Sequence, residues 1–305
     1  MIPKRYRTLG DKLFEWINNS ILCLFAFVTV YPFWSTLMVS FMDRETYSAS
    51  IFNMWPKNFT LFAYKYIFQT DWIVQGFFNS VFYTAAGTLY AMTLVCLTAY
   101  ATVKSDLVGR KIINTYFIVT MFFGAPLAAY YILYTTLLPI ANTRLVMIVG
   151  GVGVWNVLVL RNFIRGLSPS LIESARIDGA TEIAILGKII LPLSIPPIAT
   201  LTMFSLFGKW NDWFTAQVFL TGREDLFPLQ MVLRRVVLET TPGSQLGAVE
   251  EMRRAMELSA GRGLDVFKPA VNAALIMVVT LPIVAVYPFL QKYFEKGVLI
   301  GSLKE

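Results

Sequence analysis

Charged residues are bunched along the chain, and the long stretches between them contain no Asp, Glu, Lys or Arg. A membrane-spanning helix needs about 20 predominantly apolar residues. Five charge-free runs reach this length, and a sixth of 16 residues is flanked by Arg144 and Arg161, whose side chains can extend to the headgroups. The pattern therefore predicts six transmembrane helices, at residues 16–42, 72–103, 112–143, 145–160, 189–208 and 269–291.

The composition supports this interpretation. The chain has 305 residues, of which 56% are hydrophobic and only 15% are charged, whereas soluble domains carry about 25% charged residues. No histidine is present, which excludes histidine-based catalysis, proton relays and metal ligation. The two cysteines, Cys23 and Cys96, lie in apolar runs and are expected to pack as small apolar side chains. We predict an all-α membrane protein.

The distribution of basic residues predicts the orientation. With the N-terminus inside, the inner segments hold fourteen Lys and Arg residues and the short outer loops hold four; cytoplasmic loops normally carry this excess. Residues 1–15 and 292–305 are then cytoplasmic ends of a membrane domain at 16–291, and 209–268 is a long outer loop. The net charge of +7 reflects this topology and does not indicate a nucleic-acid partner.

The fifth predicted span contains Pro192, Pro196 and Pro197, and each proline removes a backbone donor and tends to kink a helix. Such a span can line a pathway or can simply pack with a kink. No ionisable residue lies deep within any predicted span, which argues against a proton-coupled transporter. The chain has no P-loop pattern, so an ATP-driven transporter would need its ATPase on another polypeptide.

The cytoplasmic segment 161–188 contains the most informative pattern. Ser170 and Glu173 have capping-box spacing and predict a helix that begins near Leu171. Asp178-Gly179 predicts its end, because glycine accepts a positive φ. A second helical run then leads into the fifth span. We expect a short helix, a tight turn and a second helix at the cytoplasmic face.

This segment resembles the EAA loop of permease subunits in binding-protein-dependent ABC importers. The family pattern is E-A-A, three residues, G, nine residues and I-x-L-P. It is matched by Glu173, Ser174, Ala175, Gly179, Ile189, Leu191 and Pro192, with Ser174 in place of the first alanine. The sequences IDGA at 177–180, WNDW at 210–213 and the ending from Tyr287 resemble the carbohydrate-uptake, maltose-type branch, and more closely its lipo-oligosaccharide permease subgroup.

The resemblance implies the type I ABC importer permease fold in a bacterial inner membrane, with no catalytic site and no cofactor in this chain. The implied partners are a homologous permease, usually a different chain, two ATPase subunits that hold ATP and Mg, and an extracytoplasmic solute-binding protein that delivers an oligosaccharide. Loop 161–188 would dock on the ATPase through Glu173, Ser174, Ala175, Asp178, Gly179 and Ala180. Glu173 has two interpretations, a helix cap, which we favour, or a salt-bridge partner on the ATPase.

By the same resemblance, the outer loop 209–268 docks the binding protein, and its residues 247–259 have a helical pattern. Trp210 and Trp213 stand three apart, as on one helix face, where they can stack on sugar rings or sit at the membrane interface. Asn211 and Asp212 can bind sugar hydroxyls or a neighbouring helix. Four arginines suggest either a path for acidic oligosaccharides or a solvated docking surface: Arg234, Arg235, Arg253 and Arg254.

Two other classes of protein compete with the importer permease. A secondary transporter or channel would need an ion gradient and no ATPase. A membrane-embedded enzyme would need catalytic groups, but the chain lacks histidine and any pair of carboxylates within a span.

Overall fold

The computed structural model describes residues 9–47, 55–104, 106–124, 126–239 and 267–302, and every regular element in these ranges is helical. The helical pattern predicted at residues 247–259, and with it the basic pair Arg253 and Arg254, lies outside these ranges. The chain divides into two compact units, residues 1–70 with 240–278, and residues 71–239 with 279–305.

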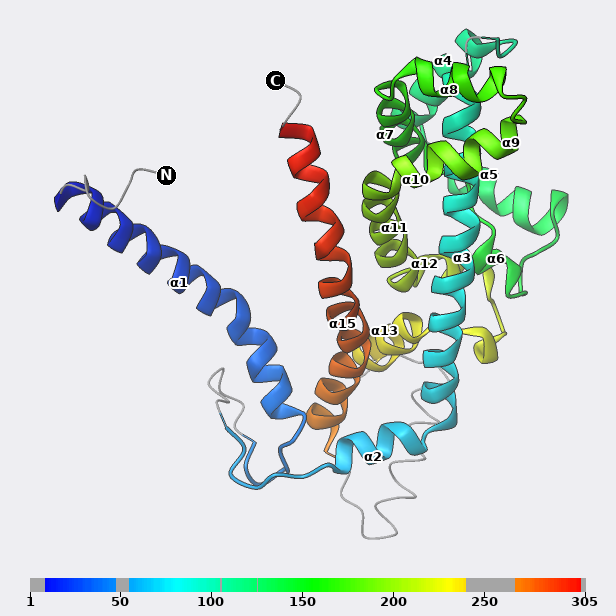
Figure 1. Cartoon of the computed structure of the whole chain (residues 1–305). Helices are drawn as coiled ribbons and strands as arrows, with labels where there is room; N and C mark the ends of the chain where they lie inside the picture. The colour runs from blue at the N-terminus through cyan, green and yellow to red at the C-terminus, as the bar shows by residue number, and fades with distance from the viewer. Residues whose placement is uncertain (1–8, 48–54, 105, 125, 240–266, 303–305) are drawn as a thin grey trace. The chain divides into compact units, whose positions relative to one another are not determined.

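The first unit contains α1 (Leu9–Val39), α2 (Phe62–Gln69) and the beginning of α15 (Lys268–Ser302), as Figure 1 labels them. Apolar side chains of α1 are exposed on nearly all sides, and only 6% of its most apolar stretch of 18 residues is buried. Such a helix suits a lipid environment, because an all-round apolar surface has no place in water. At its end, the ring of Phe41 stacks on that of Phe59 at 4.6 Å.

The second unit begins with α3 (Asp71–Val103), the longest element wholly inside it. Its other helices, before the last part of α15, are α4 (Arg110–Phe122), α5 (Leu127–Ile132), η2 (Leu133–Leu137), α6 (Leu145–Ile148), α7 (Val154–Arg165), α8 (Pro169–Ile177), α9 (Glu182–Ile185), η3 (Leu186–Ile190), α10 (Leu191–Leu193), α11 (Ile195–Trp210), α12 (Phe214–Phe219), η4 (Glu224–Leu226) and α13 (Leu229–Glu239).

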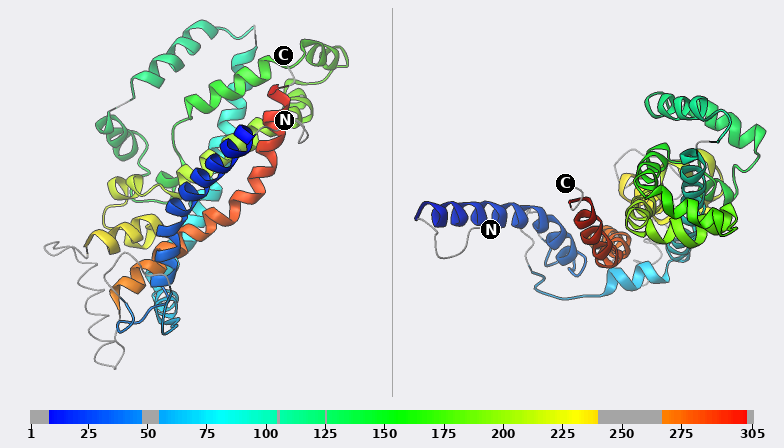
Figure 2. Two further views of the ribbon diagram at one scale, coloured as in Figure 1. Left: turned by 90° about the vertical axis from the view of Figure 1, so that its left-hand side faces the viewer. Right: turned by 45° about the horizontal axis from the view of Figure 1, so that its top comes forward.

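Helix α3 packs against α7 and α11, and the three lie side by side in both Figures 1 and 2. Their shared core includes Val95 and Ala99 of α3, Leu160 of α7 and Leu201 of α11, all at most 1% exposed. Ile185 of α9 belongs to the same cluster. The expected cytoplasmic loop, residues 161–188, therefore packs through Ile185 on the same core as the spans.

In the part of the chain that the structure describes, three helices are long and apolar enough to cross a membrane, within α1, α3 and α15, and the number is five if each of two bent pairs is one span. The fourth expected span, 145–160, is not one helix. It divides into α6 and α7 around residues 149–153, where Gly150, Gly151 and Gly153 interrupt it. Glycine disfavours a helix interior because it loses more backbone entropy than other residues on ordering. The fourth predicted span is thus interrupted, and its second part continues as α7 to Arg165.

The expected distortion of the fifth span is confirmed. Residues Glu182–Leu193 and Ile195–Trp210 form two helical segments that meet at an angle of 84°. The break at Ser194 lies between Pro192 and Pro196, and the preceding turn η3 is a π-helix. Prolines remove the amides that a straight helix would use, so the chain bends where they cluster.

Candidate functional site

Helix α8 begins at Pro169, two residues before the expected start. Ser168 is extended and precedes the helix, and Pro169 occupies its first position, for which its fixed φ is suited. No side chain caps the α8 N-terminus, and Glu173 is exposed. The predicted Ser170–Glu173 capping box is therefore wrong. The dipeptide Ser168-Pro169 was the sequence signal for the true start.

The turn after α8 is confirmed, with Gly179 at a φ of +78°. The amide of Ala180 donates to the carbonyl of Ala175 at 2.9 Å, and the amide of Gly179 donates to that of Arg176 at 3.1 Å. These two bonds form a Schellman motif, which satisfies the last carbonyls of a helix. A Cβ on Gly179 would meet no atom within 4 Å, so the need for glycine is conformational and not steric.

The residues of the expected coupling site divide between the core and the surface. Ala175 is 8% exposed and belongs to the shared core, and Ala180 packs against that core. Glu173, Ser174 and Asp178 are exposed. Burial of one small residue thus fixes α8, while its polar neighbours remain available for contacts outside the chain.

Two isoleucines are exposed on either side of the turn. Ile177 ends α8 and is 86% exposed, and Ile183 lies in α9 and is 84% exposed. Single exposed apolar side chains are common, but two that flank one rigid turn form an apolar contact surface.

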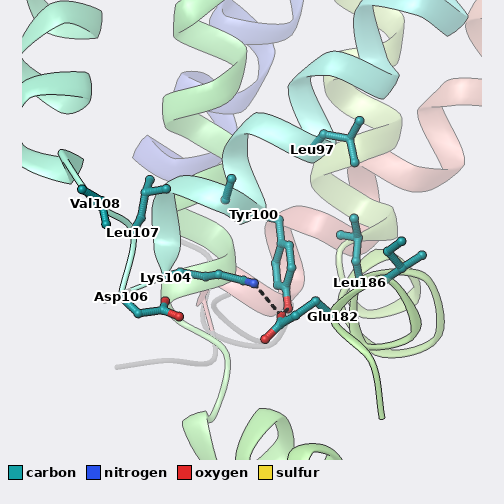
Figure 3. A pocket seen from close by; sticks show the side chains of 10 residues that line it. Leu97, Tyr100, Lys104, Asp106, Leu107, Val108, Glu182 and Leu186 are labelled. Carbon is teal, nitrogen blue, oxygen red and sulfur yellow. Dashed lines mark hydrogen bonds and ion pairs between the residues drawn. The ribbon is translucent and has the colours of Figure 1, made fainter.

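A carboxylate that the sequence analysis missed connects this turn to α3. Glu182 accepts a hydrogen bond from the hydroxyl of Tyr100 at 2.5 Å, and its carboxylate lies 2.8 Å from the Lys104 ammonium (Figure 3). Its other oxygen lies 3.1 Å from the guanidinium of Arg176 on α8. Hydrogen bonds from Lys104 and Tyr100 lower the pKa of Glu182 to about 2. Glu182 therefore stays ionised and holds α8, α9 and the end of α3 together.

A pocket of about 630 Å³ opens beside this cluster (Figure 3). Its wall combines the charged pair Lys104 and Glu182 with apolar side chains, among them Leu107, Val108 and the exposed Ile183. The turn, the pocket and the ionic cluster form one continuous surface at the end of α3.

The second expected site differs from its prediction. Helix α11 ends at Trp210, so Trp210 and Trp213 do not share a helix face. Trp210 is only 6% exposed and its indole donates to the carbonyl of Val279 at 3.1 Å. Its ring also contacts that of Phe77 edge-on. Trp210 therefore anchors α11 to α15 and α3. A ring buried in this way neither sits at the membrane interface nor offers a free face for stacking on a sugar.

The neighbouring polar residues bind within the chain. The side-chain oxygen of Asn211 accepts a hydrogen bond from the side-chain amide of Gln230 on α13 at 2.7 Å. Of the two interpretations of Asn211, this contact matches binding to a neighbouring helix. Asp212 accepts from the backbone amide of Thr215 at 3.1 Å. The guanidinium of Arg234 covers the ring of Trp213 at 3.6 Å. These contacts position the segment between α11 and α13.

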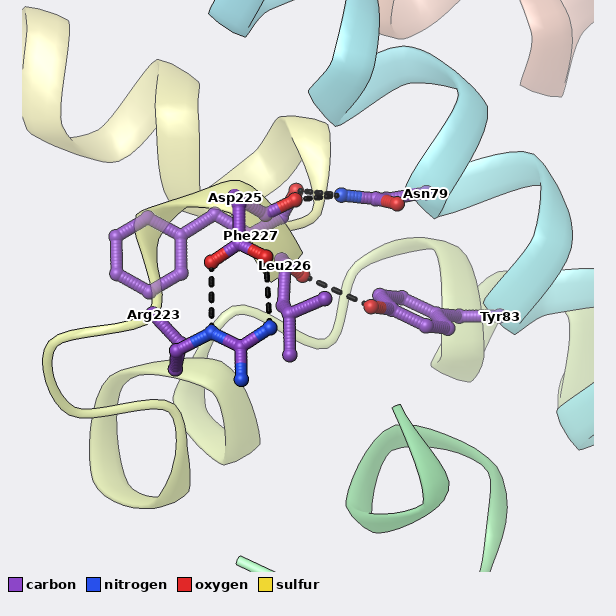
Figure 4. Close-up of polar contacts among 6 residues, drawn as sticks. All are labelled: Asn79, Tyr83, Arg223, Asp225, Leu226 and Phe227. Atoms are coloured by element: carbon purple, nitrogen blue, oxygen red, sulfur yellow. Dashed lines mark hydrogen bonds and ion pairs between the residues drawn. The ribbon is translucent and has the colours of Figure 1, made fainter. Parts of the chain in front are cut away.

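Helix α3 also holds the segment that leads into α13 (Figure 4). The amide of Asn79 donates to the carbonyls of Asp225 at 2.9 Å and Phe227 at 3.2 Å. The hydroxyl of Tyr83 donates to the carbonyl of Leu226 at 3.0 Å, and Ser80 accepts from the amide of Leu229 at 2.7 Å. We call Asn79, Ser80 and Tyr83 the α3 clamp. Its side chains are buried, and each satisfies a backbone group that is buried or partly buried.

Surface ion pairs brace the same segment. Arg223 forms a two-bond pair with Asp225, which lowers the pKa of that carboxyl. Arg235 pairs with Glu224 at 2.5 Å, and its guanidinium lies 4.4 Å from the Phe227 ring centre. Arg234 and Arg235 are thus both engaged within the chain and do not form a free basic patch here.

Sequence comparison identifies the class of protein to which this arrangement belongs. Residues 109–300 match the model of the family described as binding-protein-dependent transport system inner membrane component. The chain belongs to this family, and it is a multi-pass membrane subunit of an ABC importer.

Individual relatives cover nearly the whole chain. The polygalacturonan/rhamnogalacturonan transport system permease protein YtcP of Bacillus subtilis (strain 168) is 34% identical, over 97% of this chain and 100% of its own length. Protein LplC of the same organism is 33% identical over 99% of each chain. A chain in the crystal structure of a bacterial ABC transporter involved in the import of the acidic polysaccharide alginate is 26% identical, with a TM-score of 0.84, covering 95% of this chain and 99% of that one.

Proposed function

We propose that this chain is the permease subunit of an ATP-driven importer for an acidic oligosaccharide, and that loop 161–188 couples it to the ATPase. It forms the pathway with a homologous permease, receives its substrate from an extracytoplasmic binding protein and has no catalytic site of its own. Both termini are cytoplasmic, as the positive-inside pattern indicates.

One observation supports the coupling role above the others, namely the exposed pair Ile177 and Ile183 on a turn that is fixed from within. Gly179 sets the turn, Ala175 is buried in the core, and Glu182 ties the turn to α3. An exposed apolar pair on a rigid support suits a groove on an ATPase subunit. Glu173, Ser174 and Asp178 supply polar contacts at its edge, and Glu173 acts as a salt-bridge partner and not as a cap.

The substrate class is supported by the relatives. One is named for polygalacturonan and rhamnogalacturonan transport, and the similar solved structure belongs to an alginate importer. Both substrates contain uronic acids, so we assign an oligosaccharide with carboxylates.

The competing class of protein is a secondary transporter, which would need no ATPase and no binding protein. One experiment therefore separates an importer permease from a secondary transporter.

The test uses the complex co-purified with its permease partner, its ATPases and its binding protein, reconstituted in proteoliposomes. ATPase activity and uptake are measured with oligogalacturonate and with its methyl ester, which has no charge. Stimulation by the loaded binding protein and uptake of the acid support the proposal. Uptake by this chain alone without ATP would overturn the importer assignment, and selective uptake of a neutral oligosaccharide would overturn the substrate class.

A further inference from the structure

Lys209 lies deeper in the structure than the sequence predicts. The sequence predicts that Lys209 lies at the outer edge of the fifth span. In the structure its ammonium donates to the carbonyl of Met147 at 2.8 Å and lies 3.5 Å from the carbonyl of Ile148. Its aliphatic stem crosses Gly87 of α3, where a Cβ would come within 3.0 Å of Cδ and Cε. The absence of a side chain at Gly87 makes room for the lysine.

The position of Gly87 gives the depth of this charge. Gly87 is the central residue of α3, which runs from Asp71 to Val103. At 1.5 Å per residue it lies about 24 Å from either end of the helix. Because charges inside a membrane segment are costly, they mark substrate or ion pathways. Because Lys209 lies one residue beyond the fifth predicted span, 189–208, the charge-free runs do not reveal this charge.

The backbone beside Lys209 is irregular and partly exposed. The break at 149–153 follows the Met147 and Ile148 carbonyls, and Gly151 and Gly153 are exposed. In lipid, irregular backbone is tolerated only where protein buries it or where it lines a water-filled cavity. Broken helices in transporters commonly form substrate sites for this reason. This break therefore faces a partner subunit or an aqueous pathway, and not lipid.

The seam between α7 and α11 continues this polar surface. Ser205 lies one turn before Lys209, on the same face of α11. The amide nitrogen of Asn156 lies 3.5 Å from the Ser205 hydroxyl. Next to this pair, the rings of Trp155 and Phe204 meet edge-on and are 48% and 44% exposed. A cation, hydroxyl and amide groups and an exposed aromatic ring are the groups that recognise an acidic sugar.

We propose that the ammonium of Lys209 binds a carboxylate of the substrate in the pathway, with Asn156 and Ser205 bonding its hydroxyls. An ammonium has three donors, and the two carbonyls accept at most two of them. Lys209 is in none of the ion pairs between described residues. This inference rests on the proposed function, because it assumes an acidic oligosaccharide as substrate.

The test compares Lys209→Met, Lys209→Arg and Gly87→Ala in the reconstituted complex, in phosphatidylcholine proteoliposomes without anionic lipid. Lys209→Met removes the charge at similar length, Lys209→Arg keeps it, and Gly87→Ala displaces the stem without changing the charge. Lys65→Met, at an exposed lysine of α2, is the matched control. Uptake of oligogalacturonate is measured against uptake of its methyl ester, together with complex assembly by gel filtration.

The expected result for Lys209→Met is a loss of acid uptake of about tenfold or more, since a charged hydrogen bond is lost. Uptake of the ester by Lys209→Met should remain. Lys209→Arg should retain part of the acid uptake, and acid uptake by Gly87→Ala should lie between that of Lys209→Met and that of the wild type. An equal loss for acid and ester, or a loss of assembly, would show that Lys209 only caps α6 and overturn the inference. Unchanged acid uptake would also overturn it. A wild-type complex that transports neither acid nor ester contradicts the proposed function itself.

Discussion

The proposed coupling loop, residues 161–188, and the segment between α11 and α13, which we call the outer segment after its proposed orientation, are both short helices joined by turns, but they are held in different ways. In the coupling loop, neighbouring residues fix the turn, since Gly179, Ala180 and the carbonyls of Ala175 and Arg176 form a local motif. In the outer segment, the α3 clamp bonds backbone groups that lie 143 to 149 residues further along the chain.

This difference indicates how each region can respond when a neighbouring subunit or helix moves. The Gly179 turn keeps its shape through its own residues and can move as a unit with its exposed isoleucines, while Glu182 and Ala175 link it to α3 and to the core. A segment fixed by another helix keeps its shape only while that helix stays in place. The first arrangement suits a part that transmits movement, and the second suits a part that must follow the position of α3.

The most damaging change should be Gly179→Leu in the coupling loop. A leucine in the left-handed region costs about 1–2 kcal/mol, and the turn should relax and displace Ile177 and Ile183 from the ATPase. We expect substrate-stimulated ATPase activity and transport to be abolished while the complex still assembles, as measured in proteoliposomes and by co-purification.

Gly109→Leu is the matched control, because Gly109 has a φ of +76° and equally open surroundings. It should lower thermal stability to a similar degree but leave most of the stimulated activity. Normal uptake by the Gly179→Leu variant would contradict the coupling assignment.

A smaller effect is expected from Asn79→Ala in the α3 clamp. The variant leaves the buried carbonyl of Phe227 and the partly buried carbonyl of Asp225 without their donor, which costs about 1–3 kcal/mol. The melting temperature should fall, and protease sites in residues 220–239 should become accessible. Thr93→Val is the control on the same helix, since the Thr93 hydroxyl bonds only the Leu89 carbonyl of its own helix and is exposed. Equal protease resistance in Asn79→Ala and Thr93→Val would show that the clamp does not hold the segment.

The smallest effect should come from Glu182→Gln, which weakens the link between the turn and α3. The carboxylate is 43% exposed, so the loss should be at most about 1 kcal/mol. Because its pKa in the folded protein is lowered to about 2, its contribution is complete above about pH 4.5 and is lost as the pH falls toward 2. The difference in melting temperature between wild type and variant should stay constant from about pH 5 to pH 8. A difference that changes across this range would contradict the ionised state of Glu182.

The sequence predicts features that depend on neighbouring residues. Asp178-Gly179 gave the turn, the prolines from Pro192 gave the broken fifth span, and charge-free runs gave the long helices. The start of α8 also depends on neighbouring residues, because Pro169 occupies the first helical position and Ser170 does not cap the helix. Three glycines in 150–153 were likewise a local sign that the fourth run would divide.

Features that depend on distant residues could not be predicted in this way. Lys209 reaches the Met147 carbonyl, 62 residues away, only because Gly87 leaves room for its stem. Nothing near Glu182 in the sequence indicates Tyr100 or Lys104 as partners. Asn79 is an amide within a charge-free run, which can indicate a buried polar contact but does not identify its acceptor.

Helix α3 has a mechanical consequence, because it connects both regions. It is the only one of the three long apolar helices described here that has no internal proline. Tyr100 lies 21 residues after Asn79, which corresponds to about 32 Å along the axis. A stiff rod of this length that tilts by about 5° at one end moves its other end by about 3 Å. A small rotation imposed at the Glu182 contact would thus reach the outer segment as a displacement comparable to a hydrogen-bond length, with no change in the fold of either end.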